Sequence, residues 1–307
     1  MKLIHKVEEC AVYESNKHSY VSLSSLNPPI KTFLLKLSSS GNPETATALL
    51  LNIAKSVKPV YADTSTSIKC KALQAIPLKM FIEDMHSESE LRGMAYTLTL
   101  KLLADIGTQL EQLRAEHDLI IPFLSLEDII VIQTTREEKM KDREEKDREE
   151  KMKDREEKMK DREEKMKDRE EKMKDREEKM KDREEKMKDN KKEYVFVFVN
   201  AEKLMQQPKS DKKELIVDAP LKVNKHTSFL PVELPESALK RLPMRLTTTS
   251  WYYSLSALCI YALLQHKFKN GEDDIERVGR PFLHTSLYFC LKRCLKSDPE
   301  ERVLLYV

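Results

Sequence analysis

A charged heptad repeat occupies residues 136–189 and interrupts an otherwise ordinary chain of 307 residues. The unit REEKMKD is written seven times in full, and one five-residue copy, REEKD, comes second in line. Because the tract has neither Gly nor Pro and carries acid-before-base pairs at i,i+4, it favours a helix, about 80 Å long if continuous. Each full unit has one apolar residue where a coiled coil needs two, so a solvated single helix is favoured over a coiled coil.

The segments on either side constrain the repeat further. DLIIPFLSLEDIIVI before it and EYVFVFVNAEKL after it are rich in β-branched residues, and we predict that they pair as two halves of a hairpin. Paired strands hold their ends about 5 Å apart, whereas a continuous helix of this length would hold them about 80 Å apart. The repeat is therefore expected to bend into antiparallel halves or to stay partly disordered, unless the hairpin does not form. A hairpin tip tolerates such insertions well.

Charge and composition exclude several classes of protein. The chain has Lys+Arg 55 and Asp+Glu 53, and each repeat unit sums to zero, so we expect no nucleic-acid partner. The five glycines are too far apart for a phosphate-binding loop. The five cysteines lack metal-ligand spacing, so neither a metal site nor a disulfide framework is expected. SALCIYALL is too short to span a membrane, and the protein is expected to be cytoplasmic and monomeric.

The order of the predicted elements indicates an α+β fold. Strand-like segments such as KTFLLKL come first, followed by a helix in PETATALLLNIAKSV and a return to strand-like composition. The strongest helix is predicted over Ser89–Glu116, where apolar residues recur every three or four positions. Two further apolar helices are predicted in SWYYSLSALCIYALLQH and RPFLHTSLYFCLKRCLKS. This order predicts a lobe of strands with one helix, followed by a mostly helical lobe.

Several short strings, in this order, resemble the protein kinase family over nearly the whole chain outside the repeat. CLKSDPEERV is similar to the kinase string CLxxDPEERP, VELPESAL to the APE motif, and WYYSLSALCIYALL to DVWSLGVILYELL. The resemblance implies a two-lobed kinase-like domain, with a degenerate N-terminal lobe in residues 1–84 and a helical C-terminal lobe in residues 85–307. The repeat at 136–189 would be an insertion in the second lobe. The resemblance also implies an ion pair between Glu236, the APE glutamate, and Arg302.

The same resemblance implies that the catalytic groups of kinases are missing. When LEDIIV is aligned with the kinase string PENILV, Phe123 takes the place of the catalytic Asp, and a phenyl ring can neither accept nor orient a proton. A one-residue slip puts Leu124 there, which is equally inert. Asp128 falls on the metal-binding Asn, and Asn200 falls on the Asp that holds magnesium. No cofactor is therefore expected, and only weak binding of ATP and Mg²⁺ is implied.

The resemblance in the N-terminal lobe is fainter. Lys36 in TFLLKLS falls on the phosphate-contacting lysine, but Glu44, the one acid of the next helix, comes too early for the usual pairing, and the glycine loop is missing. Each candidate also has a structural alternative: a solvent-facing strand lysine for Lys36, and a turn residue that bonds its own backbone for Asp128. His117 and Asp118 are expected to be solvated polar groups at a helix end. The aromatic residues of WYYSLSALCIYALL are expected in the core.

The sequence therefore predicts a catalytically inactive kinase-like domain, a pseudokinase, that binds or regulates a protein partner. The alternative from another class is a structural spacer whose function is the charged helix, with small domains at each end. A divergent but active Ser/Thr kinase that uses a different base is the third hypothesis. Deleting residues 136–189 separates the first two, because the pseudokinase is expected to remain one cooperative domain and the spacer is expected to lose its function.

Overall fold

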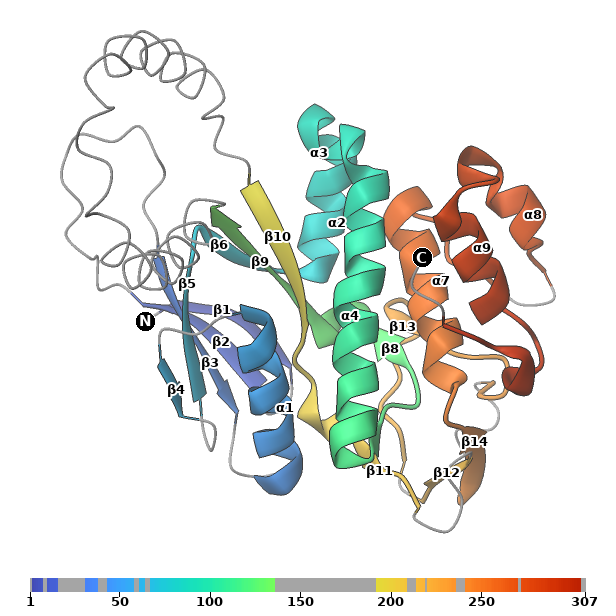
Figure 1. Ribbon diagram of the computed structural model, residues 1–307, viewed down its shortest axis with the longest axis horizontal. Coiled ribbons are helices and arrows are strands. Elements are labelled where there is room, and N and C mark those ends of the chain that lie inside the picture. Colours follow the sequence, from blue (N-terminus) through green and yellow to red (C-terminus); the bar gives the residue numbers. More distant parts are fainter. Residues whose placement is uncertain are drawn as a thin grey trace, which may run out of the picture. The chain divides into compact units, whose positions relative to one another are not determined.

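The computed structural model (Figure 1) describes residues 2–7, 10–15, 31–37, 43–57, 61–63, 67–135, 192–208, 214–218, 220–235, 241–269 and 272–304. Met1–Ile132 and Tyr194–Val307 together form one compact unit, and Gln133–Glu193 form a second. The repeat lies outside the described residues. Its helix, its bend and the coiled-coil alternative therefore stay predictions.

The described residues in the N-terminal part of the first unit form five antiparallel strands and one helix (Figure 1). The strands are β1 Lys2–Val7, β2 Cys10–Ser15, β3 Lys31–Leu37, β4 Tyr61–Asp63 and β5 Ser67–Ala72, in the order β1-β2-β3-β5-β4. Helix α1, Pro43–Val57, follows β3, has Glu44 in its first turn as predicted, and contacts β5. Phe33 and Leu35 of β3 are buried in the same core as Ile53 of α1. The sheet is therefore stabilised by an apolar face that α1 helps to cover.

A strand and three helices follow. They are β6 Gln74–Pro77, α2 Leu78–Ser87, α3 Ser89–Gly93 and α4 Ala95–His117. The prediction of one continuous helix over Ser89–Glu116 is wrong at Met94, which has φ −99° and ψ 0° and separates α3 from α4. Gly93 precedes this break, and glycine is the residue that loses most conformational freedom in a helix. The predicted apolar face is confirmed, since the buried residues of α4 include Leu98, Leu102, Ile106, Leu110 and Leu113.

The two strands that flank the repeat lie side by side. β9, Ile129–Thr135, is the central strand between β6 and β10, Lys192–Phe198. The predicted pairing of the segments before and after the repeat is therefore confirmed. Among the described residues, β10 is the last strand on its side of this sheet. Its outer edge faces α4, which runs alongside it (Figure 1).

Side chains of α4 satisfy the backbone of β10. Gln109 Oε1 accepts a hydrogen bond from the N–H of Phe198 at 3.1 Å, and Gln109 Nε2 donates to the carbonyl of Phe196 at 2.7 Å. Asp105 Oδ2 accepts from the N–H of Phe196 at 3.0 Å. Buried backbone groups need such partners. The helix therefore completes the hydrogen bonding of a strand that has a neighbouring strand on one side.

The other short strands pair two by two. They are β7 Leu119–Ile120 with β11 Met205–Gln206, β8 Leu124–Ser125 with β13 Ser228–Phe229, and β12 Glu214–Val217 with β14 Met244–Thr247. Among the described residues, short 3-10 helices join these and later elements: η1 Leu126–Asp128, η3 Ala201–Lys203, η5 Arg280–Phe282 and η6 Pro299–Glu301. In each strand pair, one strand precedes the other by many residues, so these contacts tie together distant parts of the chain.

The C-terminal part is mostly helical. It contains α7 Ser250–Leu264, α8 Ile275–Val278 and α9 Ser286–Cys294. α7 is buried along most of its length, and its residues Trp251, Tyr252 and Tyr253 belong to the core, as predicted. The helix predicted in RPFLHTSLYFCLKRCLKS is interrupted, since His284 has a φ of 64° and separates η5 from α9.

The predicted α+β class is confirmed, because a sheet with one helix precedes a mostly helical part. The predicted lobe boundary after residue 84 falls within α2 and stays a prediction. In the part of the chain that the structure describes, no helix has both the length and the hydropathy needed to cross a bilayer. Among the described residues, Cys70, Cys259, Cys290 and Cys294 are buried and form no disulfide bond. Burial raises the pKa of the Cys70 thiol to about 12, so this thiol is held in its neutral form.

Candidate functional site

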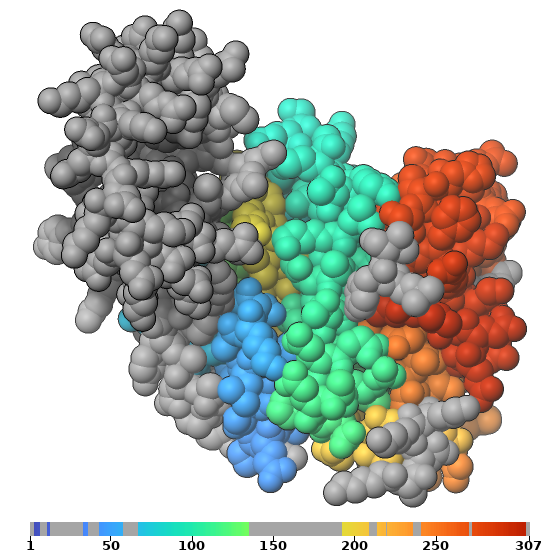
Figure 2. Space-filling model, viewed as in Figure 1, coloured from blue at the N-terminus to red at the C-terminus, as the bar shows by residue number. Residues whose placement is uncertain are grey.

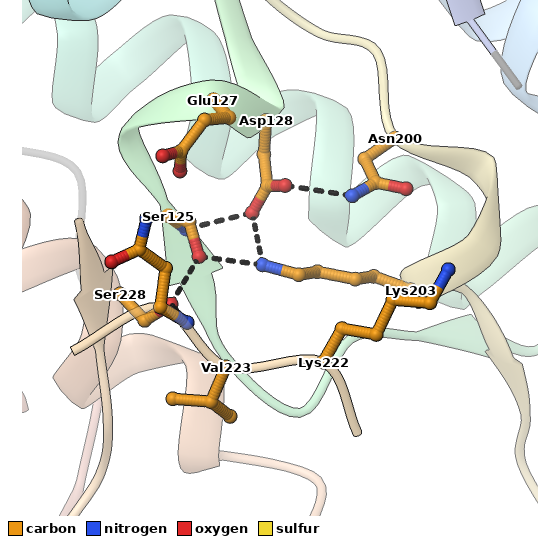
Figure 3. Close-up of a pocket in the computed structure, with 9 residues that line it drawn as sticks. Ser125, Glu127, Asp128, Asn200, Lys203, Lys222, Val223 and Ser228 are labelled. Carbon is orange, nitrogen blue, oxygen red and sulfur yellow. Dashed lines mark hydrogen bonds and ion pairs between the residues drawn. The ribbon is translucent and has the colours of Figure 1, made fainter. Parts of the chain in front are cut away.

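A polar cavity of about 310 Å³ lies where β8 leads through η1 into β9 and where β10 leads into η3 (Figure 3). Its lining includes Ser125, Glu127, Asp128, Asn200, Lys203 and Ser228. Asp128 and Asn200, two of the three residues predicted for a nucleotide site, thus meet in one place. The third, Lys36, lies on β3 opposite Ala11 and Ser67. Its side chain lies outside the described part of the structure, so its approach to the other two stays a prediction.

Asp128 is positioned by the local structure of η1. Its Oδ2 accepts a hydrogen bond from the backbone N–H of Ser125 at 2.7 Å, and the Ser125 hydroxyl accepts one from the backbone N–H of Asp128. This reciprocal arrangement is a capping box, and the string S-L-E-D has the spacing that such a box requires. The structural role predicted for Asp128, a turn residue that bonds its own backbone, is confirmed. The capping spacing itself was a sequence signal that the prediction did not use.

Asn200 connects the end of β10 to Asp128. Its Nδ2 donates to Asp128 Oδ1 at 2.8 Å, and its Oδ1 accepts from the N–H of Glu202 at 3.1 Å as the N-cap of η3. The N–H of Val199 donates to the carbonyl of Asp128 at 2.8 Å. Both ends of the Asn200 amide are therefore engaged. The amide oxygen, the atom that would coordinate a metal ion, is directed to η3 and not to Asp128.

Lys203 was not predicted as a site residue, yet its ammonium group connects the main polar groups of the cavity (Figure 3). Its Nζ donates to Asp128 Oδ2 at 2.6 Å and to Ser125 Oγ at 2.7 Å. The same Nζ lies 4.1 Å from the centroid of the Phe123 ring. The Lys203 side chain is only 12% exposed. Its one sequence signal is its position, three residues after Asn200.

Asp128 and Lys203 form a buried ion pair. Asp128 is 1% exposed, and this burial raises its pKa above the ordinary value, because a carboxylate loses its hydration there. The positive charge and hydrogen bond of Lys203 oppose the rise in pKa, as do the hydrogen bonds from Asn200 and Ser125. A buried pair of this kind contributes little net stability, because the desolvation of both charges offsets their attraction. The pair therefore determines the charge of the cavity more than the stability of the fold.

Phe123 is completely buried beneath the Lys203 ammonium. The face of its ring attracts a cation but offers no atom that accepts a proton. Leu124, the residue selected by the slipped alignment, is equally buried, and its N–H donates to Ser254 Oγ at 2.6 Å. Neither side chain can act as a general base.

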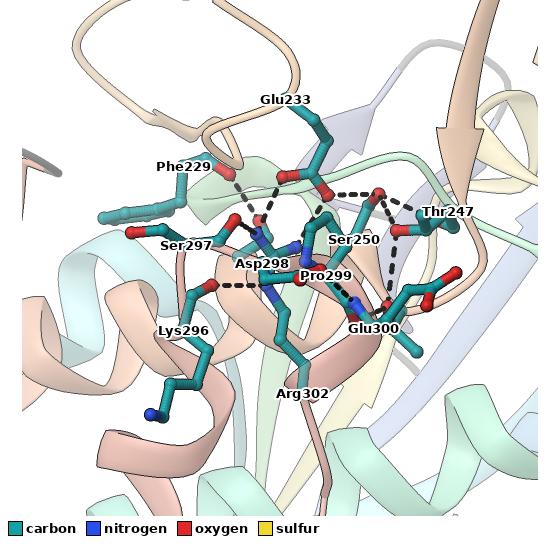
Figure 4. A network of polar contacts seen from close by, with 12 residues as sticks. Phe229, Glu233, Thr247, Ser250, Lys296, Ser297, Asp298, Pro299, Glu300 and Arg302 are labelled. Atoms are coloured by element: carbon teal, nitrogen blue, oxygen red, sulfur yellow. Dashed lines mark hydrogen bonds and ion pairs between the residues drawn. The ribbon is translucent and has the colours of Figure 1, made fainter.

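A second polar network joins the end of the chain to the segment before β14 (Figure 4). Arg302 Nη1 donates to Glu233 Oε1 at 2.6 Å, and Arg302 Nη2 donates to Glu233 Oε2 at 2.8 Å. Arg302 Nε donates to the carbonyl of Lys296 at 2.8 Å, and the Ser250 hydroxyl donates to Glu233 Oε1 at 2.6 Å. The Arg302 side chain is 0% exposed. A planar guanidinium forms such bidentate hydrogen bonds with a carboxylate, and this geometry makes the contact specific.

The acid that meets Arg302 differs from the one implied by the sequence. Glu236 lies outside the described residues, and the structure brings Glu233, three positions earlier, to Arg302. Both Nη atoms of Arg302 donate to Glu233. Glu233 in the string PVE therefore forms the ion pair that was expected for the glutamate of LPE. Burial alone would raise the pKa of Glu233, but the hydrogen bonds from Arg302 and Ser250 lower it below its ordinary value.

Comparison with known proteins gives structural likenesses but no family. No protein-family profile and no curated protein matches the sequence. Among the solved structures, a rhoptry kinase from Toxoplasma gondii is similar, with a TM-score of 0.47 and 10% sequence identity. The match covers 99% of this chain and 73% of that one. The comparisons therefore assign the chain to no family.

The remaining polar residues singled out in the sequence have structural roles. Asp118, with φ 52°, ends α4, and its carbonyl accepts from the N–H of Gln207 at 2.8 Å. The carbonyl of His117 accepts from Gln206 Nε2 at 3.4 Å. Their predicted place at a helix end is confirmed. Throughout the described residues, no three His, Cys, Asp or Glu side chains are grouped as metal ligands.

Proposed function

We propose that this chain is a kinase-like domain that does not transfer phosphate and that acts by binding a protein partner. The order of its elements supports the proposal, since a sheet with one helix precedes a mostly helical part. Two further contacts support it: Asp128 and Asn200 meet although they are distant in sequence, and Arg302 and Glu233 form a buried pair near the chain's end. These are the places where the resemblance to kinases expects a polar site and a structural ion pair.

The observation that carries the proposal is the pair formed by Phe123 and Lys203. At the position that the resemblance assigns to the catalytic Asp, the chain has a buried phenyl ring with an ammonium group 4.1 Å from its centroid. Kinases need a carboxylate there to orient the attacking hydroxyl. The ammonium also neutralises Asp128, which would otherwise be free to hold a metal ion.

A divergent active kinase is the competing function, and Glu127 is the residue on which it would depend. Within the described lining of the cavity, Glu127 and Asp128 are the carboxylates. Asp128 is paired with Lys203, so Glu127 is the group left to act as a base. This makes the competing function specific enough to test.

A phosphotransfer assay with labelled ATP, Mg²⁺ and a mixed protein substrate tests the proposal. The matched control is the double variant Glu127→Gln/Asp128→Asn, which removes both carboxylates and keeps their approximate shapes. We expect the unsubstituted chain to transfer no more phosphate than this variant. Transfer by the unsubstituted chain that the variant lacks would overturn the proposal and identify an active kinase.

A second cavity, of about 340 Å³, is suited to a protein partner. Its apolar lining comes from Phe229, Leu230, Val232, Tyr253 and Phe268, and its lysines are Lys225, Lys267 and Lys269. No acidic residue is among its described lining. Lys269 also pairs with Glu272 at 3.1 Å, but Glu272 is not part of the described lining. Apolar surface beside lysines fits a partner of opposite charge with a bulky apolar side chain. We therefore propose an acidic peptide with a central aromatic or aliphatic residue as the class of partner.

Peptide binding tests this second part of the proposal. The probe is a fluorescent peptide Glu-Glu-Phe-Glu-Glu, measured by anisotropy against Lys-Lys-Phe-Lys-Lys. We expect only the acidic peptide to bind, and we expect the double variant Lys225→Glu/Lys269→Glu to lose this binding by at least about tenfold. Lys79→Glu, an exposed lysine on α2, is the control. Equal losses in both variants, or binding of both peptides, would overturn the assignment of this cavity.

A further inference from the structure

The contacts of Lys203 have the composition of a cation site. Its ammonium is surrounded by a carboxylate oxygen of Asp128, a hydroxyl oxygen of Ser125 and the face of the Phe123 ring. Each of these groups attracts positive charge. The ammonium thus occupies the place of a bound metal ion, and the chain supplies both this cation and the groups that bind it.

We propose that Lys203 is a built-in cation that closes this cavity to divalent metal ions, and that removing its side chain opens a divalent-cation site on Asp128. The oxygen groups left behind are of the hard type that Mg²⁺, Mn²⁺ and Ca²⁺ prefer. The Ser228 hydroxyl, 2.8 Å from Ser125 Oγ, is a further oxygen of the same kind. The site follows from these contacts alone and does not depend on whether the chain transfers phosphate.

The position of Lys203 in the fold explains why it excludes a metal ion from solution. Lys203 ends η3, whose start is capped by Asn200, and Asn200 itself donates to Asp128. Although Lys203 and Asp128 are 75 positions apart in the chain, the contact between Asn200 and Asp128 holds the ammonium next to its carboxylate. A tethered group competes at an effective concentration that is millimolar or higher. A free divalent ion must displace it and leave a buried ammonium without its partner, which is strongly unfavourable.

The charge of Asp128 explains why a cation would replace the missing side chain. With Lys203 shortened to Ala, the 1% exposed carboxylate keeps its hydrogen bonds from Ser125 and Asn200 but loses the charge that compensates it. A buried, uncompensated carboxylate must take up a proton or a cation, because its isolated charge is costly. A divalent ion in millimolar supply competes with the proton for this carboxylate, and the ion is favoured more as the pH rises.

Manganese binding tests the proposal, because Mn²⁺ is a hard cation with a direct spectroscopic signal. Free Mn²⁺ is titrated by electron paramagnetic resonance against the unsubstituted chain, Lys203→Ala, and the double variant Lys203→Ala/Asp128→Asn. All three carry the same charged repeat, so the background binding of its carboxylates cancels in the comparison. We expect Lys203→Ala to bind one further Mn²⁺ at least about tenfold more tightly than the other two. The melting temperature should rise with Mn²⁺ in this variant alone.

Two results would overturn the proposal. One is equal Mn²⁺ binding by the unsubstituted chain and Lys203→Ala, since the ammonium would then exclude nothing. The other is the absence of added binding in Lys203→Ala. If Lys203→Ala does not fold, it and Lys203→Ser are refolded with and without Mn²⁺. Recovery that requires Mn²⁺ supports a cation site, and failure of both variants in both conditions counts against it, because a free cation would then be unable to replace the ammonium.

Discussion

The pair formed by Arg302 and Glu233 is a buried contact in which a single substitution should have a large effect. Replacing Arg302 with Met leaves the half-buried Glu233 carboxylate without its partner, so we expect the free energy of unfolding to fall by about 3–5 kcal/mol. Urea denaturation measures this change. The control is Arg245→Met, because Arg245 meets Glu214 at 3.0 Å with a side chain that is 74% exposed, and its loss should cost no more than about 1 kcal/mol. Similar costs for the two variants would contradict the structural role of Arg302.

Glu233 should also determine part of the acid stability. Its pKa in the folded chain is below its ordinary value of 4.5, so its contribution to stability is present above that value and is lost as the pH falls through the lowered pKa. We expect Glu233→Gln to flatten the loss of unfolding free energy below about pH 4.5, as measured by urea denaturation at several pH values. Asp128 has a raised pKa and therefore the opposite sign, so it cannot produce the same effect. If Glu233→Gln loses unfolding free energy below this pH as steeply as the unsubstituted chain, other carboxylates determine the acid stability.

For individual residues, the sequence predicted where polar side chains lie in the fold better than it predicted their hydrogen-bond partners. It placed Asp128 and Asn200 at corresponding ends of neighbouring strands, and their 2.8 Å contact follows from the pairing of β9 and β10. It did not predict Lys203, because a long side chain reaches its partner through rotamers that sequence spacing does not fix. It named Glu236 as the partner of Arg302 and did not consider Glu233, since which of two acids three residues apart meets the arginine depends on the exact path of a loop.

Among the elements, α4 has a role beyond its apolar face, because Gln109 completes the hydrogen bonding of β10. Gln109→Met keeps the approximate volume but leaves the N–H of Phe198 and the carbonyl of Phe196 without this partner. Each buried group left unsatisfied costs about 1–3 kcal/mol, so we expect a loss of at least this size in thermal or urea unfolding. Thr108→Met, at the exposed neighbouring position, should change stability by no more than about 0.5 kcal/mol. If the two substitutions have equal effects, the hydrogen bonds from Gln109 do not stabilise β10.

The elements themselves were predicted where hydrophobic periodicity is strong. The apolar faces of α4 and the buried aromatic residues of α7 follow directly from their spacing. The breaks at Met94 and His284 were not predicted, because apolar residues continue on both sides and the periodic pattern hides a one-residue change of backbone. The two-residue strands β7, β8, β11 and β13 are too short to have a pattern, and their pairing depends on contacts across the fold.

For the whole molecule, the contacts across the repeat favour one domain over a spacer with independent ends. Elements before the repeat contact elements after it at several places: β9 with β10, α4 with α7, β7 with β11 and β8 with β13. Met1–Ile132 and Tyr194–Val307 accordingly form one compact unit. Neither part could keep its buried surface if the other were removed. A chain built in this way should keep its fold without the repeat.

Deleting residues 136–189 tests this conclusion, because the residues that remain between β9 and β10 can form a short loop. The deletion leaves Asn190 and Lys191 as a two-residue loop between β9 and β10, and the further change Lys191→Gly gives the Asn-Gly pair that favours a tight hairpin turn. We expect one cooperative unfolding transition in calorimetry. Each doubling of a flexible loop costs about 0.6 kcal/mol, so the shortened chain should gain up to about 3 kcal/mol. Two separate transitions, or loss of the folded state in both deletion variants, would instead mean that the repeat is an essential part of the structure and would revive the spacer hypothesis.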